Sequence, residues 1–128
     1  MVKPAVYLAI AALLSACADG CGNTVLANSV SPDGRSGAVV FQPDCGATTG
    51  YSTQISVVRA GSRPSGAGNA YIADANHGAA AATDGGPWVE TRWIDARHLL
   101  VRYDANSRIF KQESQADGVQ ITYEAVDR

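Results

Sequence analysis

The sequence is poor in charge and has no cluster of basic residues. Charged residues make up 17% of its 128 residues, the formal net charge is −2, and the lysines and arginines are scattered. Proteins that bind nucleic acid carry a patch or run of Lys and Arg that neutralises phosphates. We therefore expect no nucleic-acid partner. The hydrophobic fraction of 46% is typical of a chain that folds into a globular domain.

Long apolar runs are also missing. The run from Ala5 to Leu14 has ten uncharged residues, whereas a membrane-spanning helix needs about 20. Because it follows Lys3 close to the amino terminus, it has the pattern of a secretory signal peptide. A buried amino-terminal helix of a cytosolic protein is the alternative. We expect export to the cell envelope, with the domain facing the periplasm.

Two processing sites overlap at the end of this run. Leu14-Ser15-Ala16-Cys17 resembles the lipobox of bacterial lipoproteins, which implies acylation of Cys17, for example with palmitate. Each buried CH₂ of such a chain contributes about 0.8 kcal/mol to membrane attachment. Ala16-Cys17-Ala18 also fits ordinary secretion, with cleavage after Ala18. We prefer lipidation, because a cysteine has no purpose in a discarded peptide, and the same resemblance slightly favours the outer membrane over the inner.

Either route leaves an even pair of cysteines, Cys21 and Cys45. In an oxidising compartment such a pair usually forms a disulfide, which would add about 3.5 kcal/mol of stability in the chain-entropy model. The alternative is a thiol nucleophile at Cys45 with His77 or His98 as its base. No nucleophile motif surrounds Cys45, and the cysteines and histidines lack the close spacing of zinc ligands. We expect neither a metal nor a cofactor.

The rest of the chain predicts one β-rich domain. We place a signal peptide at residues 1–16, a tether at 17–23 and the domain at 24–128. Apolar residues recur with period two in short runs between Gly, Pro, Asp and Asn, without a helical stripe. The expected fold is all-β, as a single small antiparallel meander, sandwich or open barrel. The predicted strands are Thr24–Ser29, Gly37–Gln42, Thr53–Arg59, Asn69–Ala73, Trp88–Ile94, His98–Tyr103, Arg108–Glu113 and Val119–Glu124.

Connections between these strands are also predicted. Ser31-Pro32-Asp33-Gly34 has proline where φ must be fixed and glycine where the backbone turns left-handed, so it should join the first two strands as a hairpin. Asp95-Ala96-Arg97 should act similarly. We expect Trp88–Ile94, His98–Tyr103 and Val119–Glu124 to form an antiparallel meander, and Ala60–Pro87 to form long loops around one short strand.

The segment Asp44–Thr53 is the most distinctive candidate for a binding loop, because it combines two glycines with five hydroxyl groups, four of them before Thr53. Its possible ligand or partner residues are Thr48, Thr49, Tyr51 and Ser52. It lacks the Gly-Lys-Ser/Thr ending of a phosphate-binding P-loop, and a structural loop pinned by the disulfide is the alternative. Asp74–Gly78 faintly matches the start of a calcium loop but lacks the closing glutamate, so we interpret it as a solvated turn.

Catalytic motifs are not evident in the sequence. It contains neither G-x-S-x-G nor a close set of His, carboxylate and Ser. The aromatic residues have strand spacing, so core packing is expected rather than a stacking platform for sugars or bases; they are Trp88, Trp93, Tyr103, Phe110 and Tyr123. We predict that the protein is not an enzyme.

Two family resemblances bear on function. Ser31-Pro32-Asp33-Gly34-Arg35, Ala38-Val39-Val40-Phe41 and Asp44-Cys45-Gly46-Ala47-Thr48-Thr49-Gly50-Tyr51-Ser52-Thr53 together resemble a family of uncharacterised small bacterial envelope lipoproteins, which implies an exported location and no known activity. Ser65-Gly66-Ala67-Gly68-Asn69-Ala70-Tyr71 resembles the Ser-x-x-Gly-x-x-Tyr loop of small lipid-anchored inhibitors of C-type lysozyme.

The predicted export signal and the composition together give the functional hypothesis. We expect a lipid-anchored, non-catalytic binding or structural module that contacts another envelope protein. The alternative, motivated by the loop Ser65–Tyr71, is a periplasmic inhibitor of a lysozyme-like wall hydrolase.

Overall fold

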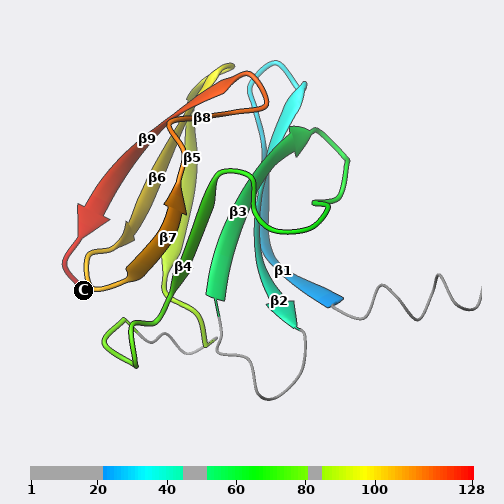
Figure 1. Ribbon diagram of the computed structural model, residues 1–128. Coiled ribbons are helices and arrows are strands. Elements are labelled where there is room, and N and C mark those ends of the chain that lie inside the picture. The colour runs from blue at the N-terminus through cyan, green and yellow to red at the C-terminus, as the bar shows by residue number, and fades with distance from the viewer. Residues whose placement is uncertain (1–21, 45–51, 81–84) are drawn as a thin grey trace, which may run out of the picture.

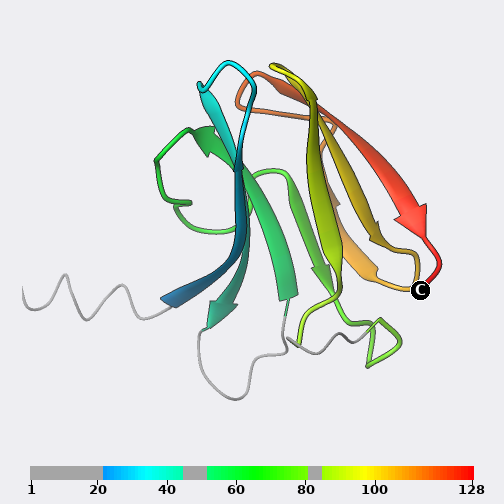
Figure 2. The same cartoon turned by 180° about the vertical axis from the view of Figure 1, so that it is seen from behind.

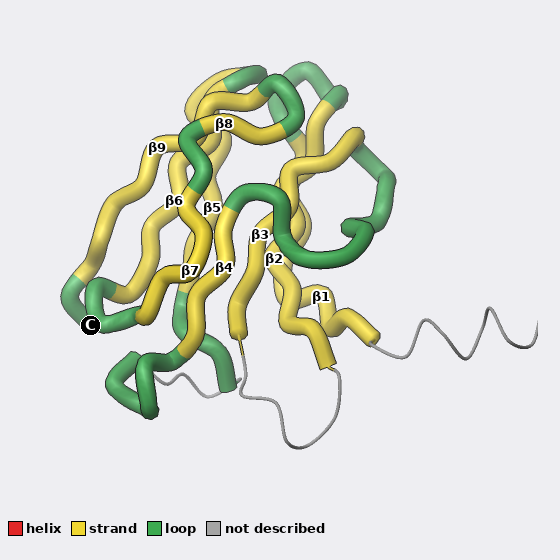
Figure 3. Tube along the Cα trace, in the orientation of Figure 1, coloured by secondary structure: helices red, strands yellow, loops and turns green. Residues whose placement is uncertain are grey.

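The computed structural model describes residues 22–44, 52–80 and 85–128, and the regular elements among them are β-strands. Figure 3 shows these strands and their connecting loops without a helix. Within these ranges no helix has the length and hydropathy required to cross a membrane. Residues 1–21, which contain the predicted signal peptide and most of the tether, lie outside the described residues.

The described strands form two sheets that pack against each other as a sandwich (Figure 1). The five-stranded sheet has the order β1-β2-β3-β4-β7 and the four-stranded sheet the order β5-β6-β9-β8. The strands are β1 (Gly22–Val30), β2 (Ser36–Asp44), β3 (Ser52–Arg59), β4 (Tyr71–Asp74), β5 (Val89–Asp95), β6 (His98–Asp104), β7 (Arg108–Gln112), β8 (Gln115–Ala116) and β9 (Val119–Val126).

The all-β prediction is confirmed, and the sandwich is not closed into a barrel. Each predicted strand overlaps an observed one, and the two sets of ends differ by no more than two residues. Only β8 was not predicted, because its two residues are too few to show a period of two. The predicted long-loop region around β4 is also confirmed, apart from residues 81–84, which lie outside the described residues.

The predicted meander of the last long strands is wrong in one pairing. β5 and β6 are antiparallel, as expected, but β6 and β9 are parallel, with Leu99 beside Ile121 and Val101 beside Tyr123. After β6 the chain crosses to the other sheet to form β7 and returns through β8. This crossover places β9 beside β6 in the same direction. Alternation of side chains along a strand cannot reveal the direction of its neighbour.

The core lies between the two sheets. On β2 and β3 the paired residues Ala38 with Val57 and Val40 with Ile55 face inward, and all four are buried. They pack with the inward side chains of the other sheet, which include Leu99, Val101, Val119 and Ile121. Full burial of a side chain of this size stabilises the fold by about 1.5–3 kcal/mol, so this layer holds the sheets together.

Three tyrosines extend this core at the β4 side. The rings of Tyr71, Tyr103 and Tyr123 lie with centroids 5.9–6.5 Å apart. The Tyr123 hydroxyl has two carbonyl oxygens within hydrogen-bond distance, that of Glu113 at 2.7 Å and that of Ala70 at 3.1 Å, and donates its one proton mainly to the nearer. The Tyr71 and Ser107 hydroxyls are both buried without a well-formed hydrogen bond among the described residues, and they lie close enough to interact with each other. Burial raises the pKa of both the Tyr71 and the Tyr123 phenol above its ordinary value.

A loop after β3 covers the outer face of the five-stranded sheet. The Asn69 side chain accepts from the Val57 N–H and donates to the Val57 carbonyl, both at 2.8 Å. The Gly68 N–H donates to Gln54 Oε1 at 2.8 Å. Val39 and Phe41 alternate with the core residues of β2, yet they are buried as well. The continuous apolar run in β2 therefore reflects a strand that is covered on both faces.

The Ser-Pro-Asp-Gly turn joins β1 to β2 as predicted. The Gly34 N–H donates to the Ser31 carbonyl at 2.9 Å, and Gly34 has a φ of 75°, which favours glycine. The Ser31 hydroxyl donates to Asp33 Oδ1 at 2.6 Å. This bond is the main reason that the pKa of the Asp33 carboxyl lies below its ordinary value, and a second bond comes from the Arg35 N–H.

Candidate functional site

A groove opens between the two sheets where their edge strands β1 and β5 separate. At one end these strands are joined by a hydrogen bond from Trp93 Nε1 to the Ser29 carbonyl, at 3.3 Å. Figure 2 shows β1 and β5 diverging toward the other end of the molecule. The groove there has a volume of about 420 Å³. Residues of both sheets line it.

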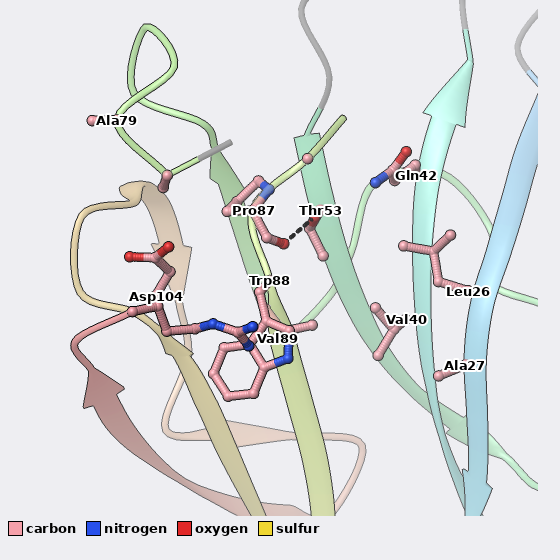
Figure 4. A pocket seen from close by; sticks show the side chains of 13 residues that line it. Leu26, Ala27, Val40, Gln42, Thr53, Ala79, Pro87, Trp88, Val89 and Asp104 are labelled. Carbon is pink, nitrogen blue, oxygen red and sulfur yellow. Dashed lines mark hydrogen bonds between the residues drawn. The ribbon is translucent and has the colours of Figure 1, made fainter. Parts of the chain in front are cut away.

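Both sheets contribute walls to the groove (Figure 4). Leu26 and Ala27 of β1 form one side, and the segment Gly86–Val89, which leads into β5, forms the other. Val40 contributes an apolar surface from β2. The polar lining residues are Gln42, Thr53, Asp104 and Arg128. The groove thus has a lining that is more polar than apolar, with apolar side chains from β1 and β2 on one side.

Gln42 is the most informative polar residue of the groove. It continues the inward-facing series of Ala38 and Val40, and 7% of its surface is exposed. Its Nε2 atom is buried and has no hydrogen-bond partner among the described residues. Leaving a buried amide donor unpaired costs about 1–3 kcal/mol. Because Nε2 itself is covered, a ligand oxygen reaches this amide only when the side chain turns toward the groove, and the hydrogen bond then removes that cost.

Close backbone packing holds the floor of the groove. The Thr53 hydroxyl donates to the Pro87 carbonyl at 2.7 Å, which fastens the approach to β5 onto β3. At Gly86 a Cβ would collide with Thr53 Oγ1 and would lie 3.0 Å from Gln42 Nε2. There is no room for a side chain at this position, so it requires glycine, and the floor is tightly packed there.

Charge enters the groove through two residues. The Arg128 guanidinium stacks over the Trp88 ring, 4.1 Å from its centroid, as a cation–π pair. Asp104, at the end of β6, is 7% exposed, and its carboxylate accepts the Asn106 N–H at 2.9 Å. In the described part of the chain Asp104 forms no salt bridge. One carboxylate and one guanidinium therefore face a cleft whose lining is more polar than apolar.

Most of the residues singled out from the sequence lie outside the described residues. These are Cys17, Cys21, Cys45, Thr48, Thr49 and Tyr51. Ser52 is described: it begins β3, is half-buried, and its hydroxyl accepts from Gln54 Nε2 at 3.1 Å. The lipidation, the disulfide and the binding-loop hypothesis therefore stay predictions.

The two histidines are not brought together. His77 lies in the turn after β4, whereas His98 begins β6, and these two points lie at opposite ends of the sandwich (Figure 1). His98 Nε2 contacts Thr122 Oγ1 at 2.6 Å. In residues 22–44, 52–80 and 85–128 no group of three or more His, Cys, Asp or Glu is placed to hold a metal ion. Asp74, from the segment compared with a calcium loop, pairs with Arg108 instead.

The aromatic prediction is confirmed in part. Trp93, Tyr103 and Tyr123 pack against the core. Phe110 is 61% exposed on β7 and lies under the Arg108 guanidinium, 5.1 Å from its ring centroid, so core packing is wrong for this residue. Trp88 lines the groove rather than the core. β7 is an edge strand, which leaves one face of Phe110 without a covering element.

The loop compared with lysozyme inhibitors is held against the sheet. Tyr71 is fully buried, and a Cβ at Gly68 would lie 2.8 Å from the carbonyl oxygens of Ile55 and Tyr71. Ser65, Gly66 and Ala67 are exposed. The tyrosine that would carry the resemblance is therefore part of the core. The inhibitor hypothesis stays a prediction, and no contact in the described residues favours it.

The groove residues were not selected from the sequence. One signal was present, because Gln42 follows Ala38 and Val40 at the inward positions of a predicted strand, where a polar residue needs an explanation. Trp88, Asp104 and Arg128 come from different elements, and only the packing of the two sheets brings them together.

The fold and the groove define this protein as a small two-sheet β-sandwich with a cleft at one open edge. The chain matches no protein-family model, no curated protein and no solved structure.

Proposed function

We propose that this chain is an exported, lipid-anchored envelope protein that works without catalysis, by binding an extended polypeptide segment at the groove and the adjoining edge of β1. The observation that carries the proposal is the buried, unpartnered Gln42 amide at the groove. A peptide carbonyl is the hydrogen-bond acceptor that such an amide lacks. The apolar groove walls, with Leu26 and Val40, suit the side chains of the same segment.

The free edge of β1 supports a polypeptide ligand over a small molecule. β1 is the terminal strand of its sheet, so one of its edges has no strand beside it in the part of the chain that the structure describes. A segment added to a free edge gains main-chain hydrogen bonds, and pockets for its alternate side chains give specificity. Leu26 belongs to this strand and also lines the groove. One segment could therefore contact the edge and the groove together.

The lipid anchor is supported by the amino-terminal sequence. Leu14-Ser15-Ala16-Cys17 follows an uncharged run of signal-peptide length. The tether from Cys17 to the start of β1 at Gly22 is short, so an anchor at Cys17 would hold the edge of β1 near the membrane surface.

The anchor is tested by labelling bacteria that express the full chain with an alkyne fatty acid. We expect the label on the wild type and on Cys21→Ala, which keeps the lipobox cysteine, and its loss in Cys17→Ala. Labelling that persists in Cys17→Ala would remove the anchor from the proposal.

The binding function is tested with a photoreactive benzoylphenylalanine placed at Leu26 of the full chain in living bacteria. The matched control carries it at Phe110, an exposed residue on the far edge strand β7. We expect an adduct with a polypeptide after irradiation from the Leu26 position and not from Phe110. Equal yields at both positions, or none at either, would refute binding at this edge.

Gln42→Leu separates binding from folding. The substitution removes the unpartnered amide and keeps a side chain of similar size, so we expect the folded state to be as stable as the wild type or more so. The adduct from Leu26 should fall about fivefold, which corresponds to one lost hydrogen bond of about 1 kcal/mol. An unchanged adduct would show that this amide does not contact the ligand.

A further inference from the structure

The four edges of the two sheets differ in their protection against added strands. An exposed edge is normally blunted by charged residues, by proline or by being very short. β7 carries Arg108 and Lys111, β5 carries three charged residues, and β8 is two residues long. β1 has nine residues, Gly-Asn-Thr-Val-Leu-Ala-Asn-Ser-Val, with no charge and no proline. Among the described edge strands, only β1 is long and lacks both charged residues and proline, so nothing in its sequence opposes the addition of another strand.

The side chains of β1 are exposed to an unusual extent for an apolar strand. Val25 is 53% exposed, Leu26 41% and Val30 54%. Val25 pairs with Phe41 and Val30 with Gly37, so both valines lie on the outer face of the sheet. A shift of register between Val25 and Ala27 leaves Leu26 out of the ladder with β2, and Leu26 lines the groove. Apolar surface is thus available on both sides of this edge.

The available length of the edge is set by β5. The hydrogen bond from Trp93 to the Ser29 carbonyl brings β5 against the carboxyl end of β1. The rest of β1 lies where the two strands diverge (Figure 2). The segment from Gly22 to Asn28 is therefore long enough to pair with a strand of ordinary length.

Resting on the proposed function, we infer that the polypeptide segment bound at this edge is β1 of a second copy of this chain. The two strands pair antiparallel about a two-fold axis, and the five-stranded sheets of both copies join into one continuous sheet. Two-fold pairing sets each strand against itself, so any charged residue near the axis faces its own copy, which is destabilising. β1 is free of this penalty, whereas β7, with two basic residues, is not.

Self-pairing also accounts for the apolar side chains of β1. In the paired strands Val25 of one copy lies beside the edge of the other, and Leu26 of each copy faces the region between β1 and β5 where the groove opens. The exposed side chains of Val25 and Leu26 are then partly covered by the strand of the partner copy. Attachment of both copies to one membrane would raise their effective concentration and favour the pair.

The inference is tested by the mass of the photoadduct formed from Leu26 in the full chain. We expect an adduct of twice the chain mass that contains only this protein, and self-association of the purified full chain in detergent by sedimentation. An adduct with a different polypeptide, from a chain that stays monomeric, would overturn the second copy as the ligand and leave the proposed function standing. No adduct would overturn both.

Charge placed on β1 gives the sharper test. Val25→Lys sets two lysines close to each other across the axis and should weaken self-association about tenfold. Phe110→Lys adds the same charge on β7 and should leave it unchanged. A mixture of Val25→Lys and Val25→Glu copies should pair again, because opposite charges then face each other. Restored pairing is expected of self-recognition and not of a third protein.

At a protein concentration low enough for every chain to be monomeric, equal unfolding midpoints of the Val25 variants and the wild type show that the fold is kept, as the exposure of Val25 leads us to expect. A dimer that persists unchanged in Val25→Lys, or a mixture that fails to pair, would overturn β1 as the contact between copies.

Discussion

At the scale of single residues, the interior of this sandwich contains polar atoms whose bonding differs sharply. The Tyr123 hydroxyl donates its one proton to the Glu113 carbonyl at 2.7 Å, with the Ala70 carbonyl a second acceptor at 3.1 Å. The Tyr71 hydroxyl, beside it in the same ring cluster, has the buried Ser107 hydroxyl nearby and no well-formed hydrogen bond among the described residues. A buried hydroxyl stabilises only when it is paired. Loss of the hydroxyl should therefore cost more at Tyr123 than at Tyr71.

We predict that Tyr123→Phe lowers the free energy of unfolding by about 1–1.5 kcal/mol, because its hydrogen bonds are lost. Tyr71→Phe should change it less, since the ring keeps its packing and the hydroxyl that is removed has no well-formed hydrogen bond. Urea unfolding of the two variants measures the difference. A larger loss in Tyr71→Phe than in Tyr123→Phe would show that the Tyr71 hydroxyl is bonded in solution.

A second prediction at the residue scale concerns Gly86. Gly86→Ala forces a methyl group against Thr53 at the floor of the groove, and overpacking of this kind costs about 1–3 kcal/mol. Gly22→Ala is the matched control, because a Cβ there meets nothing within 4 Å. Denaturant midpoints should separate the two variants, and equal midpoints would mean that the floor can yield.

At the scale of elements, an ion pair joins β4 to its neighbour, the edge strand β7. The Arg108 guanidinium binds the Asp74 carboxylate with Nε 3.1 Å from both oxygens, and a further bond comes from its Nη2 atom. This pair is the main reason that the pKa of Asp74 lies below its ordinary value, and the Asn76 N–H adds to the effect. Asp74 and Arg108 are also partners in the register of the two strands.

The lowered pKa makes this contact dependent on pH. An unfolded Asp titrates near about 3.9, so the contribution of Asp74 is complete above that value and is lost as the pH falls through the lower folded pKa. We predict that Asp74→Asn is less stable than the wild type at about pH 7 and that the gap narrows toward about pH 2.5. Urea midpoints across this range measure it, with Asp127→Asn, exposed beyond β9, as the control.

At the scale of the whole molecule, the last strand holds the smaller sheet together. β9 lies between β6 and β8, so the four-stranded sheet has no continuous ladder without it. Its side chains Val119 and Ile121 belong to the core. The parallel pairing of β6 and β9 joins segments separated by β7 and β8, and such non-local contacts form late in folding.

We predict that a chain ending at Gly118 does not fold, whereas one ending at Val126 does. The shorter chain loses β9 and its share of the core, while the longer loses only Asp127 and Arg128, which stacks on Trp88. Circular dichroism and thermal unfolding distinguish the two. A cooperative transition in the chain that ends at Gly118 would show that the larger sheet folds alone.

Local pattern was enough to predict the strands and the first hairpin. Alternation along β5, β6 and β9 and the turn residues around Pro32 act over a few neighbouring positions, and so they can be recognised without knowledge of the fold. The same reasoning missed the two-residue β8 and placed Phe110 in the core, because neither the length nor the edge position of a strand is encoded in its alternation.

The sequence by itself determined that the chain is β-rich, that Gly34 ends a tight turn, and that β1 carries no charge, since these depend on residue type and local spacing. Only the tertiary structure decided which strand lies at an edge, that β6 and β9 run parallel, and that Gln42 meets Trp88 and Arg128 around one groove. The physical reason is that backbone hydrogen bonds between strands are the same for every residue type. Partner, direction and edge position are therefore chosen by how the whole set of apolar faces can be buried at once.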